Sequence, residues 1–142
     1  MKSIAIVGGG QAGLPVAFGL LAKGYNVTVI TNRTPDEVRQ GKVMSSQCMF
    51  HPALEVEREL GINDWEDVCP PVQGIGFAVP HPEVPGERVI NWSAPLDKPA
   101  QATDQRIKMP AWLEQLEARG AKVRYEDVGV AELEQLAEKH DL

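Results

Sequence analysis

The glycines near the start of the chain have the spacing of a phosphate-binding loop. Gly8, Gly10 and Gly13 form a G-x-G-x-x-G pattern, with Gln11 and Ala12 between the last two. The first glycine permits a tight turn out of a strand, the second lets the backbone approach a pyrophosphate, and the third lets a helix pack closely on the strand. The free N–H groups and the positive dipole end of that helix would then face the phosphates. The pattern predicts that these five residues bind the pyrophosphate of a dinucleotide.

The segments around these glycines stand in the order that such a site requires. An apolar run over residues 4–7 precedes them, a helix is predicted over residues 11–23, and a second β-rich run follows over residues 27–30. A strand, a glycine turn, a helix and a second strand in this order favour a dinucleotide site over a glycine-rich turn without a ligand.

The end of the second strand leaves the identity of the dinucleotide open. An acidic residue usually stands there, about 20 positions after the glycines, and binds the ribose hydroxyls. Here Thr31 and Asn32 occupy that position, and Arg33 follows. Neutral side chains can still hydrogen-bond a ribose, whereas Arg33 could instead pair with a 2′-phosphate or be a solvated loop residue. These residues alone leave FAD, NADP and NAD as alternatives.

Composition and charge exclude several classes of protein. The chain has 142 residues, of which 43% are hydrophobic and 24% charged, as expected of one ordinary globular domain. The formal net charge of −6 argues against nucleic acid as a partner. Basic residues are scattered, and no apolar run reaches the ~20 residues that a membrane-spanning helix needs. The glycines also interrupt any secretory signal, so the expected location is cytoplasmic.

The cysteines and histidines show no spacing typical of metal ligands. Cys48 and Cys69 form neither a C-x-x-C pair nor a zinc pattern, and we expect two reduced thiols. His51, His81 and His140 lie far apart in the sequence. The sequence therefore predicts no metal site.

The rest of the chain alternates between helical and β-like patterns. We expect a loop over residues 32–42, and then helices and strands in the following order: a helix over 52–60, strands over 74–79 and 88–92, a helix that begins near Thr103 or Asp104 or else near Pro110 and ends at Arg119, a strand over 121–125 and a helix over 130–139. Prolines concentrate in the middle of the chain, which favours an antiparallel hairpin there.

These elements predict the α/β class, with a Rossmann-like FAD/NAD(P)-binding domain that carries an antiparallel β insertion. The single domain would span residues 1–142, with its core at 1–35 and 100–142 and the insertion at about 65–99. The last predicted helix has no strand after it, although a parallel sheet completes each crossover with a strand. We therefore expect a domain truncated before its final strands, as the N-terminal portion of a longer protein; a compact natural miniature is the alternative.

Several stretches resemble the epoxidase component of the two-component styrene and indole monooxygenases. The matching stretches are the opening IAIVGGGQAGL, then VTVITNRTPDE, HPALEVERELG at 51–61, Asp104-Gln105-Arg106, LEARGAKVRYEDV at 116–128, and the tail from Ala131 to Leu142. Family members look similar at the non-acidic ribose position, so the resemblance favours FAD. It covers this chain nearly end to end, but only the first part of the family's length.

The resemblance implies a flavoprotein with a fold like that of the aromatic hydroxylases. Such an enzyme takes reduced FAD from a separate NADH-dependent flavin reductase and uses oxygen to epoxidise a small aromatic alkene or indole. Arg106 would reach the flavin phosphates, and Ser46 would lie with Gln47 and His51 in the flavin and substrate region. Gln47 and His51 are the catalytic candidates; polar loop residues, with His51 capping the next helix, are the alternative. A surface arginine is the alternative for Arg106.

Other interpretations stay open at this stage. An NADP-dependent reductase domain would use Arg33 on the 2′-phosphate, and a non-catalytic dinucleotide-binding module would need no substrate site. A single-component aromatic hydroxylase would reduce its own flavin with NAD(P)H. We expect Trp92 and Trp112 to be packing residues rather than flavin stackers, and a homodimer that covers an exposed sheet edge is one expected assembly.

Overall fold

The computed structural model describes residues 2–44 and 47–142, which fall into two compact units. The first unit contains residues 1–46 and 104–142, and the second contains residues 47–103. Within the described residues, no helix is long and apolar enough to span a lipid bilayer.

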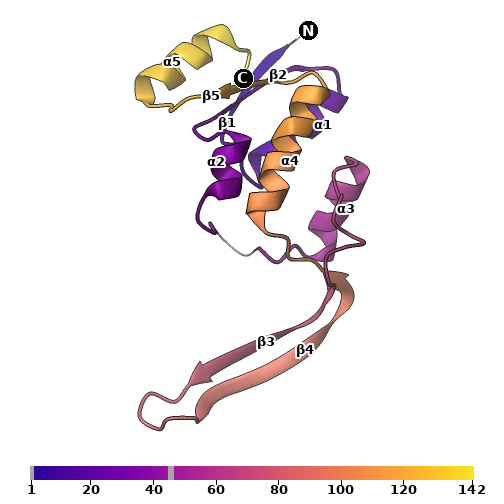
Figure 1. Ribbon diagram of the computed structural model, residues 1–142, viewed down its shortest axis with the longest axis vertical. Helices are drawn as coiled ribbons and strands as arrows, with labels where there is room; N and C mark the ends of the chain where they lie inside the picture. Colours follow the sequence, from indigo (N-terminus) through magenta and orange to yellow (C-terminus); the bar gives the residue numbers. More distant parts are fainter. Residues whose placement is uncertain (1, 45–46) are drawn as a thin grey trace. The chain divides into compact units, whose positions relative to one another are not determined.

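The first unit is built on a three-stranded parallel sheet (Figure 1). Its strands are β1 (Ser3–Val7), β2 (Asn26–Thr31) and β5 (Lys122–Tyr125), in the order β1-β2-β5. The register pairs Ile4 with Val27 and Thr31 with Tyr125. Because β1 and β5 both pair with β2 in parallel, the carboxyl ends of all three strands lie at one edge of the sheet.

The described residues of this unit form four helices: α1 (Gly13–Ala22), α2 (Pro35–Gln40), α4 (Gln105–Ala118) and α5 (Val130–Lys139). The helix α1 packs on β1, β2 and α4, while α4 also packs on α2 and β5. Figure 1 shows α5 on the other side of the sheet. The connections from β1 to β2 and from β2 to β5 proceed in one direction along the sheet, whereas the chain after β5 returns through α5 to the edge of β1. Because such crossovers are right-handed, the reversal of direction places α5 on the opposite face.

The core of the first unit is apolar and lies between the sheet and the pair α1 and α4. Its fully or almost fully buried side chains are Leu14, Ala17, Phe18, Val27, Val29, Ile30, Met109, Trp112, Leu113 and Leu116. The rings of Phe18 and Trp112 meet edge to face, with centroids 6.4 Å apart. The prediction that Trp112 is a packing residue is therefore confirmed.

The loop expected over residues 32–42 is wrong, because α2 forms there. Thr34 caps this helix by accepting from the backbone N–H of Glu37, and the Glu37 carboxylate accepts from the N–H of Thr34 at 2.8 Å. The backbone N–H and the hydroxyl of Thr34 both donate to the Glu37 carboxylate, and these two bonds hold the pKa of Glu37 below its usual value. Pro35 occupies the first turn, where its missing N–H is no loss, and Val38 is buried. The polar composition of the segment favoured a loop, although Thr34, Pro35 and Glu37 form a complete N-terminal capping motif.

The helix α4 begins at Gln105, so the alternative start near Pro110 is also wrong. The Asp104 carboxylate caps the helix by accepting from the backbone N–H of Arg106 at 2.8 Å. Pro110 lies inside the helix and is buried, so its ring packs in the core although it removes one helical hydrogen bond.

The backbone after α5 pairs with the outer edge of β1. Asp141 donates its N–H to the carbonyl of Ser3 at 2.8 Å, and Ala5 donates to the carbonyl of Leu142 at 2.9 Å. Alternate residues of β1 direct their backbone N–H and C=O groups away from β2, and at this edge those of Ser3 and Ala5 bond to Asp141 and Leu142.

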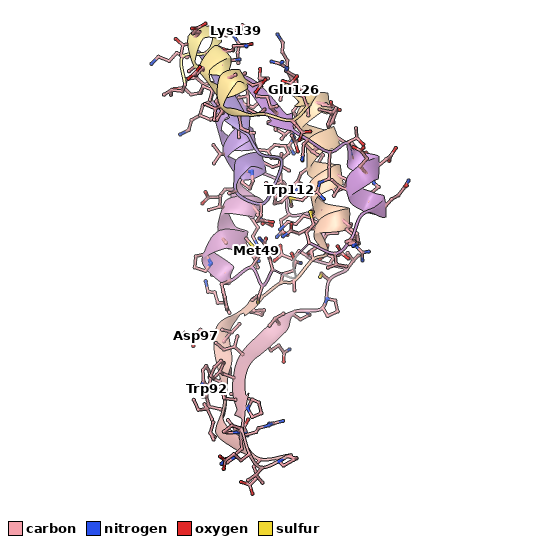
Figure 2. The ribbon with its side chains drawn as sticks, turned by 90° about the vertical axis from the view of Figure 1, so that its left-hand side faces the viewer. Met49, Trp92, Asp97, Trp112, Glu126 and Lys139 are labelled. Carbon is pink, nitrogen blue, oxygen red and sulfur yellow. The ribbon has the colours of Figure 1, made fainter. Side chains whose placement is uncertain are left out.

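The second unit consists of α3 (His51–Glu59) and a long antiparallel hairpin of β3 (Val72–Pro80) and β4 (Arg88–Ala100). The predicted hairpin is confirmed, although both strands are longer than expected. Trp92 packs beside Phe77 with ring centroids 6.2 Å apart, yet it remains 49% exposed. Figure 2 labels Trp92 on the hairpin and Trp112 inside the first unit. The predicted boundaries between core and insertion remain predictions.

Gly13, the first residue of α1, packs tightly against the backbone that follows β1. A Cβ atom on Gly13 would lie 2.2 Å from the carbonyl oxygen of Gly8, which is far inside van der Waals contact. Gly8 itself has φ +124° and donates its N–H to the Ile30 carbonyl at 2.8 Å. The backbone at Gly8 is therefore fixed from two sides, and only glycine fits at Gly13.

We expect Gly13→Ala to destabilise the protein by about 1–3 kcal/mol, because a backbone oxygen cannot rotate away as a side chain can. Urea unfolding followed by circular dichroism measures the change. Gly10→Ala is the matched control, since a Cβ there meets nothing within 4 Å. An unfolding midpoint for Gly13→Ala equal to that of the control would contradict the close packing.

Candidate nucleotide-binding site

A pocket of about 390 Å³ lies at the carboxyl ends of the three parallel strands. Its lining comes from the glycine loop, the ends of β2 and β5, and residues of α2 and α4: Val7, Gly8, Gly9, Gly10, Ile30, Thr31, Asn32, Arg33, Val38, Met44, Gln105, Met109, Glu126, Asp127 and Val128. Ligands of open α/β sheets bind at this edge.

The glycine loop leaves space for a ligand at one position and packs tightly at its neighbour. Gly10 has open space where a side chain would stand, so its backbone is accessible from the pocket. A Cβ on Gly9 would lie 2.9 Å from Oγ1 of Thr31, so the loop and the end of β2 are in close contact. The α1 helix has no side-chain cap and no acidic residue in its first turn. Its N-terminus therefore suits an anion.

Among the described residues, three charged side chains line the pocket, and they follow two different strands. Arg33 follows β2, and its Nη2 lies 2.7 Å from Sδ of Met44. Glu126 and Asp127 follow β5, and the N–H of Glu126 donates to the Thr31 carbonyl at 2.9 Å. Both carboxylates thus stand beside the strand end that lacks an acidic residue.

The sequence predicted five of the residues that line the pocket: Gly8, Gly10, Thr31, Asn32 and Arg33. Gln11 and Ala12 follow directly, before Gly13 begins α1. Glu126 and Asp127 were missed as site residues. The signal that could have found them is the predicted strand over 121–125, because the ends of parallel strands meet at one edge.

Arg106 does not belong to the lining of this pocket. Its Nη2 lies 2.6 Å from Oδ2 of Asp104, and this ion pair raises the pKa of Arg106 and lowers that of Asp104. A role for Arg106 at flavin phosphates remains a prediction.

The catalytic candidates belong to the second unit, and Ser46 lies outside the described residues. Gln47 has a buried Oε1 with no hydrogen-bond partner in the described part of the chain. His51 is the first residue of α3 but not its cap, which is Phe50, so the capping alternative is wrong. Lys98 Nζ lies 3.0 Å from Nε2 of His51. A catalytic role for Gln47 and His51 remains a prediction.

His51 also lines a second pocket of about 470 Å³, together with Arg58, Lys98 and Gln101. In the described residues, no three His, Cys, Asp or Glu side chains gather as a metal site would require. Cys48 and Cys69 are free thiols.

Comparison of the chain with known proteins gives sequence relatives and structural neighbours. No protein-family model matches it. Styrene monooxygenase StyA of Pseudomonas fluorescens is 36% identical over 143 residues, and StyA of Pseudomonas sp is 35% identical over 143 residues. Nearly the whole chain is similar to styrene monooxygenase. The alignments cover 99% of this chain and 33% of each relative, so the chain spans about one third of their length.

Three solved structures of enzymes share the fold. A flavin-dependent brominase matches with a TM-score of 0.66 at 16% identity, over 87% of this chain and 29% of its own. Tetrameric 2-methyl-3-hydroxypyridine-5-carboxylic acid oxygenase matches with a TM-score of 0.63 at 16% identity, over 89% of this chain and 32% of its own. Aklavinone-11 hydroxylase, solved with FAD and aklavinone, matches with a TM-score of 0.59 at 20% identity, over 87% and 25%. The predicted Rossmann-like fold and the predicted resemblance are both confirmed.

We expect Gly10→Ala to weaken dinucleotide binding about 10-fold or more while unfolding stability changes by no more than about 0.5 kcal/mol. The added methyl group would occupy the open space in front of the loop, where a pyrophosphate must approach. Calorimetric titration with a dinucleotide measures the affinity. An unchanged affinity in a folded variant would mean that no ligand approaches the loop at Gly10.

Proposed function

We propose that the chain binds FAD and is the FAD-binding part of a flavin-dependent monooxygenase that epoxidises a styrene-like or indole-like substrate. The observation that carries the proposal is the pocket at the glycine loop, in a chain that is 36% identical to a styrene monooxygenase along its length. A cytoplasmic location belongs to the same proposal.

Each part of the pocket has a distinct task in this proposal. The backbone N–H groups of the loop, from Gly10 to the start of α1, bind the pyrophosphate. Thr31 and Asn32 accept and donate hydrogen bonds at the adenosine ribose as neutral groups. When bound, reduced FAD supplies the chemistry that activates oxygen, and the protein binds, orients and shields it.

The proposed partner is an NADH-dependent flavin reductase that supplies reduced FAD, as expected for a two-component enzyme. The substrate is a small aromatic alkene or an indole. Gln47 and His51 are proposed to act in the flavin and substrate region, and a homodimer is the proposed assembly. The chain spans 33% of the length of the styrene monooxygenase that it matches, so the substrate, partner and assembly are proposals.

One observation favours a second candidate, an NADP-dependent reductase domain. Arg33 lines the pocket at the strand end where a 2′-phosphate would lie. A guanidinium binds a phosphate well, so this alternative needs a direct test.

Calorimetric titration of the 142-residue chain with FAD, and separately with NADPH, tests the proposal. We expect FAD to bind with micromolar or tighter affinity and NADPH to bind more weakly. Arg33→Ala distinguishes the two candidates. If Arg33 binds no phosphate of FAD, the variant should bind FAD with an affinity within about 3-fold of that of the unmodified chain. Binding of NADPH without binding of FAD, with loss of NADPH binding in Arg33→Ala, would replace the monooxygenase with the reductase.

A further inference from the structure

We propose that Glu126 and Asp127, at the end of β5, supply the acidic ribose contact that β2 lacks. The pocket would then select a nucleotide whose adenosine ribose has a free 2′-hydroxyl over one with a 2′-phosphate. This inference rests on the proposed nucleotide site and names its specificity.

The sheet register brings the two carboxylates to the ribose position. Thr31 at the end of β2 pairs with Tyr125 at the end of β5, and the next residue, Glu126, donates its N–H to the Thr31 carbonyl at 2.9 Å. Both acidic residues then line the same pocket as Thr31 and Asn32. Dinucleotide folds usually place their ribose carboxylate at the end of the second strand. In this chain the carboxylates follow β5, the neighbour of β2, at the same edge of the sheet.

The two carboxylates are not equivalent. Glu126 Oε1 lies 2.6 Å from Nη2 of Arg124, so an ion pair already occupies this carboxylate. Among the described residues, Asp127 takes part in no ion pair, and its side chain is exposed at the pocket rim. Asp127 is therefore the stronger acceptor for ribose hydroxyls, and Glu126 is the second.

The charge of the lining opposes a 2′-phosphate. Among the described residues that line the pocket, two have carboxylates, Glu126 and Asp127, and one has a guanidinium, Arg33. An ionised carboxylate only accepts hydrogen bonds, so it binds hydroxyl groups and repels a phosphate of charge about −1.5 to −2. Arg33 lies against Met44, and its charge also acts on Glu37, whose pKa it helps to lower. Arg33 therefore already interacts with Met44 and Glu37, and these interactions weaken its attraction for a 2′-phosphate.

The test compares ADP-ribose with 2′-phospho-ADP-ribose, which differ only at the 2′ position and contain no flavin. Calorimetric titration uses the 142-residue chain, Asp127→Asn, Glu126→Gln and Glu134→Gln. Glu134 is an exposed acidic residue of α5 outside the pocket and is the matched control. We expect the unmodified chain and Glu134→Gln to prefer ADP-ribose at least 10-fold. Asp127→Asn should weaken ADP-ribose binding about 10-fold and reduce the preference, and Glu126→Gln should have a smaller effect.

Equal or tighter binding of 2′-phospho-ADP-ribose by the unmodified chain would overturn the inference. So would the same preference for ADP-ribose in folded Asp127→Asn and Glu126→Gln. Absence of binding for both nucleotides would also overturn it, because the pocket would then bind no adenosine ribose. A parallel FAD titration separates the two proposals. FAD binding without dependence on Asp127 refutes the inference alone, and Asp127-dependent ADP-ribose binding without FAD binding refutes the flavin proposal alone.

Discussion

The contact between Gly13 and Gly8 is the constraint on which the first unit depends. A Cβ at Gly13 would stand 2.2 Å from the Gly8 carbonyl oxygen, so the helix α1 can begin directly against the end of β1 only with glycine at this position. That approach brings Phe18 of α1 onto Trp112 of α4 and closes the core above the sheet. It also fixes the uncapped N-terminus of α1 beside the pocket. Packing and ligand binding thus depend on the same short distance.

Parallel pairing provides the second condition for the pocket. The strands β1, β2 and β5 all end at one edge, so three segments far apart in the chain line one cavity. The loop after β1 contributes accessible backbone, the end of β2 contributes neutral polar groups and Arg33, and the end of β5 contributes carboxylates. Each segment alone is unremarkable; the chemistry arises because the sheet brings them together, as expected for function built on a common fold.

The sequence predicted the features that depend on local patterns. The glycine spacing indicated the turn and the helix after it, and two runs of β-prone residues in a proline-rich segment indicated the hairpin of β3 and β4. The helix α2 escaped prediction because its residues are polar, although Thr34, Pro35 and Glu37 carry a capping signal. Glu126 and Asp127 were missed although the strand before them was predicted, because their place beside Thr31 depends on the pairing of β5 with β2, which is not a local pattern. For the same reason, Gln47 and His51 could be named but not placed.

The likeness to styrene monooxygenase covers almost all of this chain and one third of the relatives, so the central claim concerns the nucleotide pocket of the first unit. Nuclear magnetic resonance of the isotope-labelled chain, with and without FAD, tests that claim most directly. The account predicts that amide resonances of residues 8–13, 31–33 and 126–128 shift on addition of FAD, while those of the β3–β4 hairpin keep their positions. Shifts confined to residues 47–103, with the glycine loop unaffected, would contradict it.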